Sequence, residues 1–378
     1  MSNPYTLFIR EESTLDRVGQ LDQFISFISR SRFNGIGTWV LELDYGNPLT
    51  AYLGLGYGIV LQRGADVIFS GPINSPEVSW ELGNKTFRVS GFDDLSYLTR
   101  RLALPEPSTA SPPYNTDEFD NRTGVGSTII RQYVDYNIGP NARTARIESG
   151  FTLAADPAIG DSITGNARYH NLLDFIVDLA LDAGGLGLQV LDKEFSTYTP
   201  TDLSASIVFS EGRANLNNYN YLIKNPQANY IFVGDEDEGT VREIVERSDG
   251  ASISSFGVFE SFLDKSDTTV TAELQAAGDI ELAQKKEIGS VSFEPRETNK
   301  ILYQQDYKLG DQVKFRLDAS SSINDVIREV EIEISQTESR TRVSIATSEE
   351  STNPELFRLF AGMNKKALDL RLSKLERK

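Results

Sequence analysis

Short runs of alternating hydrophobic and polar residues fill most of the first hundred positions. The run FISFISRSRF is followed by Asn34-Gly35 and then by IGTWVLELD. This order predicts a β-hairpin, because Asn-Gly favours the positive φ angles of a type I′ turn. Further strands are expected before Gly91, so residues 1–100 predict a small β-barrel. In the second run of the hairpin, three apolar residues fall on one face: Trp39, Leu41 and Leu43.

A second stretch, far along the chain, repeats the pattern of the first. Residues 58–90 and 310–346 each begin with a glycine at the head of a short strand and turn through polar residues into a Val/Ile strand. Each then crosses another polar turn into an alternating strand. We therefore expect two similar barrels, the second over residues 205–350. Two equivalent surfaces in one subunit would allow an oligomer to bind a ring of higher symmetry. Catalysis does not require such a duplication. The positions expected to correspond are Val60 with Val313 and Val89 with Val343.

Between the two β regions the pattern changes to mixed α and β. A short helix predicted at 92–102 cannot continue through the four prolines within residues 105–113. Residues 124–137 and 171–182 have helical periodicity, and Gly184-Gly185 stops the second helix. We expect an α/β insertion domain over residues 101–204. The cap residues predicted for its second helix are Asn171 and Asp174.

β character resumes near residue 205, around the segments ASIVF, NYIFVGD and TVREIVERS. A helical excursion is predicted within the second barrel at residues 251–288, where Leu274, Ala277, Leu282 and Ala283 recur at helical intervals. The segment 351–378 predicts a C-terminal helix that is more basic than the rest of the chain. The predicted fold class is therefore mainly β with α+β insertions.

Composition excludes several kinds of chemistry. The chain has 378 residues, no cysteine and a single histidine, His170, so thiolate sites and multi-histidine metal sites are excluded. His170 stands at the head of a predicted helix, where we expect no catalytic role. A net charge of −18 argues against a surface that binds the phosphates of nucleic acid. No stretch approaches the roughly 18 apolar residues of a membrane span, and residues 1–20 lack an apolar signal core.

No motif identifies a catalytic, cofactor or metal site. The glycines of LGLGYG, residues 53–58, lead into a strand, whereas a dinucleotide fingerprint leads into a helix. The acidic runs 117–120 and 235–238 lack the ligand spacing of a calcium loop. Two distant carboxylates could still meet as a glycosidase pair, and the aromatic residues leave sugar binding open.

Several segments, in order, resemble siphophage tail-tip hub proteins, over about residues 7–347. Each motif alone is weak, and their combined order and spacing carry the resemblance. The segments are Gly35-Ile36-Gly37-Thr38-Trp39, Gly58 to Val60, Phe69 to Pro72, Asn215-Leu216, NYIFVGD with Arg242, FGVFE (256–260) before Asp267-Thr268, and DYKLGDQV (306–313).

The resemblance implies a structural baseplate hub of the virion, at the distal end of the tail, assembled in the host cytoplasm. Such hubs resemble those of contractile tails, in which a homotrimer joins a hexameric tail tube or distal tail ring to a threefold tip. The implied partners are the distal tail or tail tube protein, the tape-measure protein and a tip fibre or spike protein, while DNA passes without specific binding.

The resemblance implies structure and not lysis, with no cofactor and no membrane insertion. The alternatives are a cell-wall-degrading glycosidase and a carbohydrate-binding receptor-recognition protein of the tail tip. The C-terminal helix lies outside the resemblance. We expect it to pack on a neighbouring subunit or on the tip protein, through the apolar residues Leu356, Leu359, Phe360, Met363 and Leu370.

Overall fold

The computed structural model describes residues 4–81, 83–109, 112–114, 116–237, 239–266, 268–286, 288–296, 301–316, 322–335 and 339–345. The chain divides into two compact units, each made of three segments. The first unit is Met1–Ile207, Glu294–Val313 and Val326–Val343; the second is Val208–Phe293, Lys314–Asp325 and Ser344–Lys378. The predicted C-terminal helix and its five interface residues lie outside the described residues.

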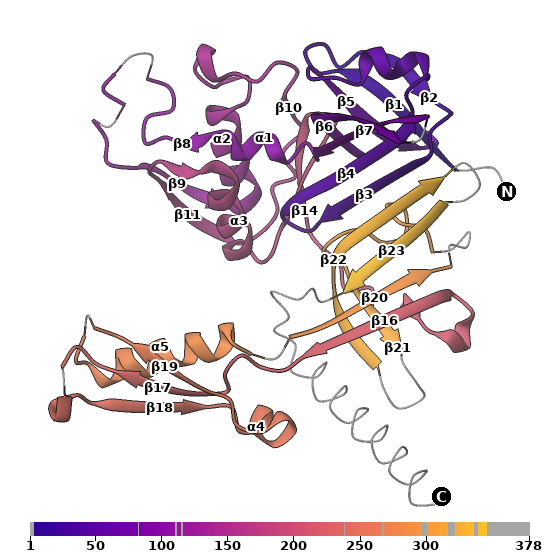
Figure 1. Cartoon of the computed structure of the whole chain (residues 1–378). Coiled ribbons are helices and arrows are strands. Elements are labelled where there is room, and N and C mark those ends of the chain that lie inside the picture. The colour runs from indigo at the N-terminus through magenta and orange to yellow at the C-terminus, as the bar shows by residue number, and fades with distance from the viewer. Residues whose placement is uncertain are drawn as a thin grey trace, which may run out of the picture. The chain divides into compact units, whose positions relative to one another are not determined.

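The first hundred residues form a strongly bent antiparallel sheet, drawn in indigo and violet in Figure 1. Its strands follow the order β3-β4-β7-β6-β5-β1-β2. The long strand β6 pairs first with β5 and then with β7, and the register shifts between Ile73 and Ser75 where it changes partner. The bounds are β1 (Tyr5–Glu11), β2 (Arg17–Leu21), β3 (Ser26–Arg32), β4 (Gly35–Asp44), β5 (Tyr57–Arg63), β6 (Asp66–Glu81) and β7 (Asn84–Phe92).

Alternation along β4 builds the core of this sheet. Trp39, Leu41 and Leu43 are all buried, as predicted, and the indole of Trp39 lies 6.3 Å from the Phe27 ring, centroid to centroid. Each such side chain contributes about 1.5–3 kcal/mol when it leaves water. Phe87 on β7 is also buried, which confirms the inward face predicted from its alternation.

The predicted hairpin of β3 and β4 is confirmed, but its turn lies one residue earlier than expected. Asn34 has a φ of 49°, whereas Gly35 already belongs to β4 and has no positive φ. The side chain of Asn34 donates to the Leu186 carbonyl at 2.9 Å and accepts from the Leu188 amide at 2.8 Å. These two bonds hold Asn34 in the left-handed conformation, so a type I′ turn centred on Asn34-Gly35 is wrong.

The middle segment of the first unit packs two helices against short strands around a separate core. Asn171 caps α3 as predicted, accepting from the amides of Leu173 and Asp174, and Gly184 and Gly185 end the helix with φ angles of 93° and 79°. The core includes Ile130, Tyr133, Leu172, Ile176 and Phe195. The bounds are α1 (Ser96–Thr99), β8 (Leu102–Ala103), β9 (Asp120–Val125), α2 (Gly126–Asn137), β10 (Thr152–Leu153), β11 (Ser162–Ala167), β12 (His170–Asn171), α3 (Leu172–Asp182), β13 (Gly187–Leu191) and β14 (Glu194–Tyr198).

The second copy of the repeated pattern forms three strands, as predicted. Strand β21 pairs with β22, and β22 pairs with β23, which is the same order as in β5-β6-β7. Val343 and Ile345 on β23 are fully buried, like Val89 on β7. Strand β22 also pairs antiparallel with β3 through residues 329–335. The bounds are β21 (Gln312–Arg316), β22 (Ser322–Ser335) and β23 (Ser339–Ile345).

The second unit contains a small three-stranded sheet with the order β18-β17-β19. Helix α5 contacts β17 and β18, and Figure 1 shows it on one side of the strands. The core between them contains Ile231, Val233 and Leu274. The bounds in this unit are β15 (Val208–Phe209), β16 (Leu216–Lys224), β17 (Tyr230–Gly234), β18 (Ile244–Ser248), α4 (Gly250–Phe256), β19 (Glu260–Asp264), α5 (Thr271–Gln284) and β20 (Ile288–Pro295).

The predicted helical excursion at 251–288 is only partly helical. Helices α4 and α5 are present, but β19 lies between them and pairs parallel with β17. From Glu260 to Asp264, exposed and half-buried positions alternate with a period of two, which suits a strand and not a helix. The predicted fold class, mainly β with α+β insertions, is confirmed by the strands that make up most of the described elements.

Candidate functional site: a buried ion cluster beside a small pocket

A cluster of buried charges lies within the first unit, where β1 meets the start of α1 and the β13–β14 turn. Its centre is Arg10 on β1, whose side chain is not exposed to solvent. Arg10 donates to both oxygens of Asp94, and the contact to Oδ2 is 2.8 Å. Glu12 lies 3.0 Å from Nε of Arg10, and Asp192 lies 3.0 Å from one terminal nitrogen. Burial alone would lower the pKa of Arg10, but the Asp94 and Glu12 carboxylates raise it overall, so the group stays charged.

The β13–β14 turn contributes the second cation of the cluster. Asp192 and Lys193 both have positive φ, at 52° and 61°, and form the tight turn between the paired residues Leu191 and Glu194. The Lys193 side chain is 1% exposed, and its ammonium donates to the Glu12 carbonyl at 2.6 Å and to the Ser149 carbonyl at 3.0 Å. These bonds fix the insertion to the first β region.

The remaining polar groups of the cluster donate hydrogen bonds to the carboxylates of Asp94 and Glu12. Ser70 donates to Oδ2 of Asp94 at 2.6 Å, and the Lys193 amide donates to the same oxygen at 3.1 Å. Tyr97 donates to Glu12, and burial raises the pKa of its hydroxyl far above the ordinary value. Every charge in the cluster therefore has an opposite charge or a hydrogen-bond donor beside it, and the cluster links the insertion to the first sheet.

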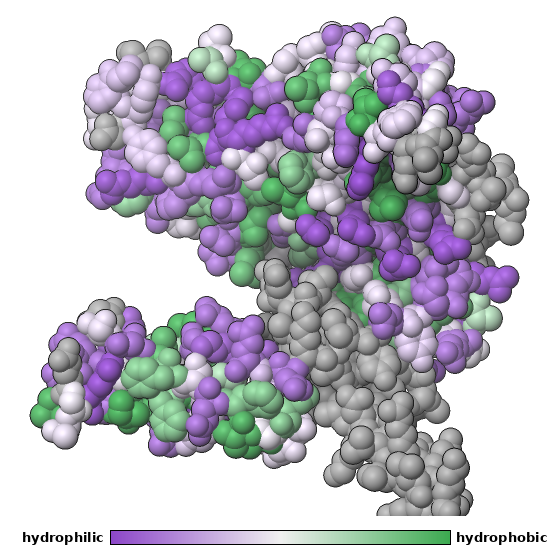
Figure 2. Space-filling model, viewed as in Figure 1, coloured by the Kyte–Doolittle hydropathy of each residue, from purple (hydrophilic) through white to green (hydrophobic). Residues whose placement is uncertain are grey.

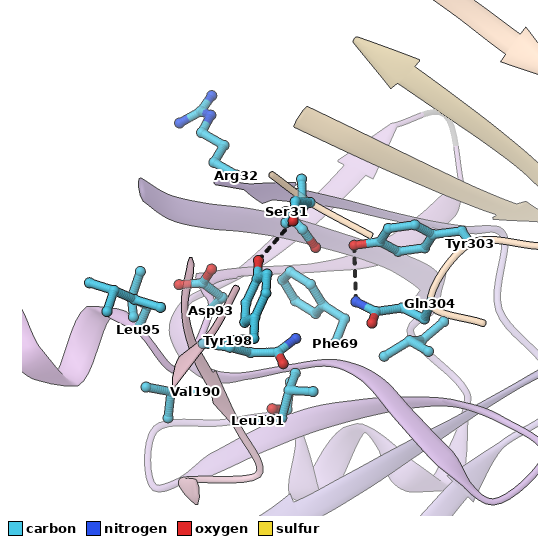
Figure 3. Close-up of a pocket in the computed structure, with 15 residues that line it drawn as sticks. Ser31, Arg32, Phe69, Asp93, Leu95, Val190, Leu191, Tyr198, Tyr303 and Gln304 are labelled. Atoms are coloured by element: carbon cyan, nitrogen blue, oxygen red, sulfur yellow. Dashed lines mark hydrogen bonds between the residues drawn. The ribbon is translucent and has the colours of Figure 1, made fainter. Parts of the chain in front are cut away.

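A small pocket adjoins this cluster and is shown in Figure 3. Phe69, Asp93, Val190, Tyr198 and Tyr303 are among its lining residues. The Tyr198 hydroxyl donates to the Leu309 carbonyl at 2.9 Å, and Gln304 donates to the Tyr303 hydroxyl at 3.2 Å. Its cavity volume of about 40 Å³ holds a few water molecules and is too small for a sugar or a nucleotide.

Asp93 is the one carboxyl group among the described residues that line this pocket. Its Oδ2 accepts the Gly37 amide at 2.7 Å, while Oδ1 has no hydrogen-bond partner among the described residues. The pKa of Asp93 is raised from 3.8 to about 7, chiefly by burial and also by the neighbouring Asp94 charge, against the lowering effect of the Gly37 bond. Asp93 faces a small pocket and is its single carboxyl group among the described lining residues, so the geometry gives no support to a glycosidase pair there.

Of the other residues singled out in the sequence, His170 and Glu118 are exposed and Asp235 is buried. The exposed His170 ring stacks on Phe175 with the centroids 5.3 Å apart. Glu118 pairs with Arg168 at 2.9 Å. Asp235 lies in the β17–β18 turn and accepts the Asp237 amide at 3.1 Å. Among the described residues, no three His, Cys, Asp or Glu side chains gather as metal ligands, and no helix is long and apolar enough to cross a membrane.

The buried cluster itself could not be identified in the sequence. Arg10 and Glu12 stand near the N-terminus, where charged residues indicate only the lack of a signal core. Their partners Asp94 and Lys193 lie 84 and 183 positions after Arg10. No periodic pattern links such distant positions, because burial depends on how the insertion packs on the sheet.

The fold defines the class of protein to which this chain is similar. The 43 kDa tail protein of prophage MuSo2 from Shewanella oneidensis matches 90% of this chain and 98% of its own length, with a TM-score of 0.54 and 12% identity. The tail protein from Neisseria meningitidis MC58 matches 91% of this chain and 97% of its own, with a TM-score of 0.52 and 12% identity. The chain thus has the fold of phage tail proteins. No curated protein matches its sequence.

The chain belongs to the Siphovirus ReqiPepy6 Gp37-like protein family, whose model matches residues 6–346. This match confirms the siphophage relationship predicted from the sequence, and its bounds are close to the predicted 7–347.

Proposed function

We propose that the protein is the structural hub of a siphophage tail tip. Three copies form a ring that joins the sixfold tail tube or distal tail protein to the threefold tip, which holds a fibre or spike protein. The tape-measure protein and DNA leave through its channel. The hub has no enzymatic role and is assembled in the host cytoplasm before it becomes part of the distal end of the virion.

The repeated three-strand pattern is the observation that carries this proposal. Strands β5-β6-β7 and β21-β22-β23 have the same order, and each ends in a strand whose alternate residues are buried. One chain with two equivalent modules gives a trimer six modules, which matches a sixfold tube. The domain division that follows is 1–100 and 205–350 for the two modules, with the insertion 101–204 between them.

The pairing of β22 with β3 supports a role that needs rigidity. These strands pair over seven residue pairs, from Glu329 opposite Arg32 to Ser335 opposite Ser26. Ion pairs lie across the seam, Arg30 with Glu331 at 2.6 Å and Arg32 with Glu329 at 2.9 Å. Each exposed pair contributes little, about 0.2–1 kcal/mol, but the backbone ladder fixes the register of the second module against the first.

Mass in solution together with electron microscopy of the purified protein tests the proposal. We expect a mass three times 42.0 kDa and a ring with threefold symmetry and six similar lobes. A purified protein that stays monomeric at micromolar concentration in the presence of its tube protein would contradict the hub. Release of soluble sugars from host cell wall would instead support the glycosidase.

A further inference from the structure

The β17-β18-β19 sheet of the second unit has one face covered by α5 and one face open. Ile231 and Val233 of β17 are fully buried against the helix side. Because side chains alternate along a strand, Tyr230, Phe232 and Gly234 lie on the other face. There Phe262 is 51% exposed and Ile244 is 47% exposed, so no described element covers this face. Figure 2 shows hydrophobic surface on this part of the molecule.

The strand register places the aromatic side chains of the open face side by side. Phe232 stands opposite Phe262 on β19 and opposite Glu246 on β18. Tyr230 stands opposite Glu260, and its ring centroid is 5.1 Å from that of Phe232. The open face therefore has an aromatic centre with exposed carboxylates on both outer strands.

One cation lies at the end of this face. A Cβ on Gly234 would come within 2.5 Å of Nε of Arg242, so the guanidinium lies against the bare backbone there. Arg242 pairs with Asp264, and its Cζ is 5.2 Å from the centre of the Phe262 ring. Asp264 balances the charge of Arg242, which leaves Glu246 and Glu260 as the net negative charges beside the aromatic rings.

We infer that the open face of this sheet binds residues 354–378 of a neighbouring copy. That segment has seven Lys and Arg and three Asp and Glu, a net charge of +4 in a chain of net charge −18. It also has Leu and Phe side chains at helical intervals. Basic and apolar groups together complement a face of aromatic rings and carboxylates, through ion pairs, cation–π contacts and apolar burial.

A neighbouring copy can supply the segment, because every copy carries both this face and residues 354–378. A contact of this type runs head to tail, and head-to-tail contacts can close into a ring. This inference rests on the proposed function, because the contact requires an oligomer. The contact would stabilise the ring of copies.

Charge reversal in the full chain tests the contact. The face variant combines Glu246→Lys with Glu260→Lys, and the segment variant combines Lys365→Glu with Lys366→Glu. All four side chains are charged, and the two on the sheet are exposed, so folding should persist. We expect each variant alone to raise the dissociation constant of the oligomer at least tenfold at low ionic strength, measured by analytical ultracentrifugation.

The chain that carries all four reversals should restore assembly to within about threefold of the unmodified protein, because every reversed face then meets a reversed segment. In an equimolar mixture of the two variants, the basic segment of the face variant meets the acidic face of the segment variant, but a head-to-tail ring of three copies always keeps at least one mismatched contact, so assembly should recover only in part. A matched control combines Glu236→Lys with Glu273→Lys. It changes the net charge by the same amount as the face variant but leaves the open face unaltered, so it should assemble normally. A separate variant, Phe262→Ser, should weaken assembly by loss of apolar contact.

Three results would overturn the inference. Normal assembly of both reversed variants would show that the segment binds elsewhere, and the hub proposal would stand. No recovery of assembly in the mixture, with recovery in the chain that carries all four reversals, would show that the segment binds its own copy. Loss of cell-wall glycan binding in Phe262→Ser, with normal assembly, would assign the face to sugar.

Discussion

Arg10 and Asp94 form a two-pronged ion pair in which neither side chain is exposed to solvent. The pair joins β1 to the segment before α1, and Lys193 on the β13–β14 turn also donates its amide to Asp94. Because a buried carboxylate without a partner is costly, we expect the Arg10–Asp94 contact to stabilise the packing of the insertion on the first sheet.

Removing the cation should destabilise the first unit strongly. Arg10→Met keeps much of the side-chain volume but leaves Asp94 with no opposite charge in contact, so we expect a loss of about 3–5 kcal/mol in the free energy of unfolding. Urea unfolding followed by tryptophan fluorescence measures this, since Trp39 lies in the same sheet.

The matched control is Arg17→Met. Arg17 pairs with Asp192 at 2.6 Å, but 27% of its side chain is exposed, so its loss should cost no more than about 1 kcal/mol. Equal losses of unfolding free energy in the two variants would show that burial does not increase the contribution of the Arg10 ion pair to stability.

Asp93 should make stability depend on pH. The folded protein holds the Asp93 proton up to about pH 7, whereas the unfolded chain releases it near pH 3.8. Between these values the folded state binds the extra proton, so the contribution of Asp93 falls as pH rises and is constant above about pH 7. The slope is at most about 1.4 kcal/mol per pH unit.

Asp93→Asn should remove this slope while keeping an acceptor for the Gly37 amide. The variant should therefore gain stability relative to the unmodified protein from pH 4 to pH 7, as seen in parallel urea titrations at several pH values. If the two proteins keep a constant difference across that range, the raised pKa of Asp93 is wrong.

The sequence predicted what depends on local periodicity and missed what depends on packing. The β3–β4 hairpin and the cap of α3 by Asn171 follow from residues within a few positions of each other, and both were found. The turn at Asn34 shifted because Leu186 and Leu188 bind its side chain from 152 and 154 positions away. Strand β19 was missed because its partner β17 lies 30 positions earlier along the chain. Long-range pairing overrides weak local preference in such short segments.

His170 should be dispensable. Its ring is exposed and stacks on Phe175, and its Nδ1 accepts only the Arg168 amide at 3.1 Å. His170→Gln should leave oligomeric mass unchanged and change phage titre less than twofold in a complementation assay. A loss of infectivity beyond tenfold with unchanged oligomeric mass would revive a catalytic role.

Gly58 and Gly310, which begin the two repeated patterns, should both resist substitution, for different reasons. A Cβ on Gly58 would come within 2.7 Å of the Gly71 carbonyl oxygen in the paired strand, while Gly310 has a φ of 83° and lies against the Phe33 ring. We expect each alanine variant to lose about 1–3 kcal/mol of unfolding free energy in urea. Gly54→Ala is the control, because that site is open and lacks a positive φ, and it should change stability by less than about 0.5 kcal/mol. Wild-type stability in either alanine variant would mean that the close packing at the head of that strand can relax.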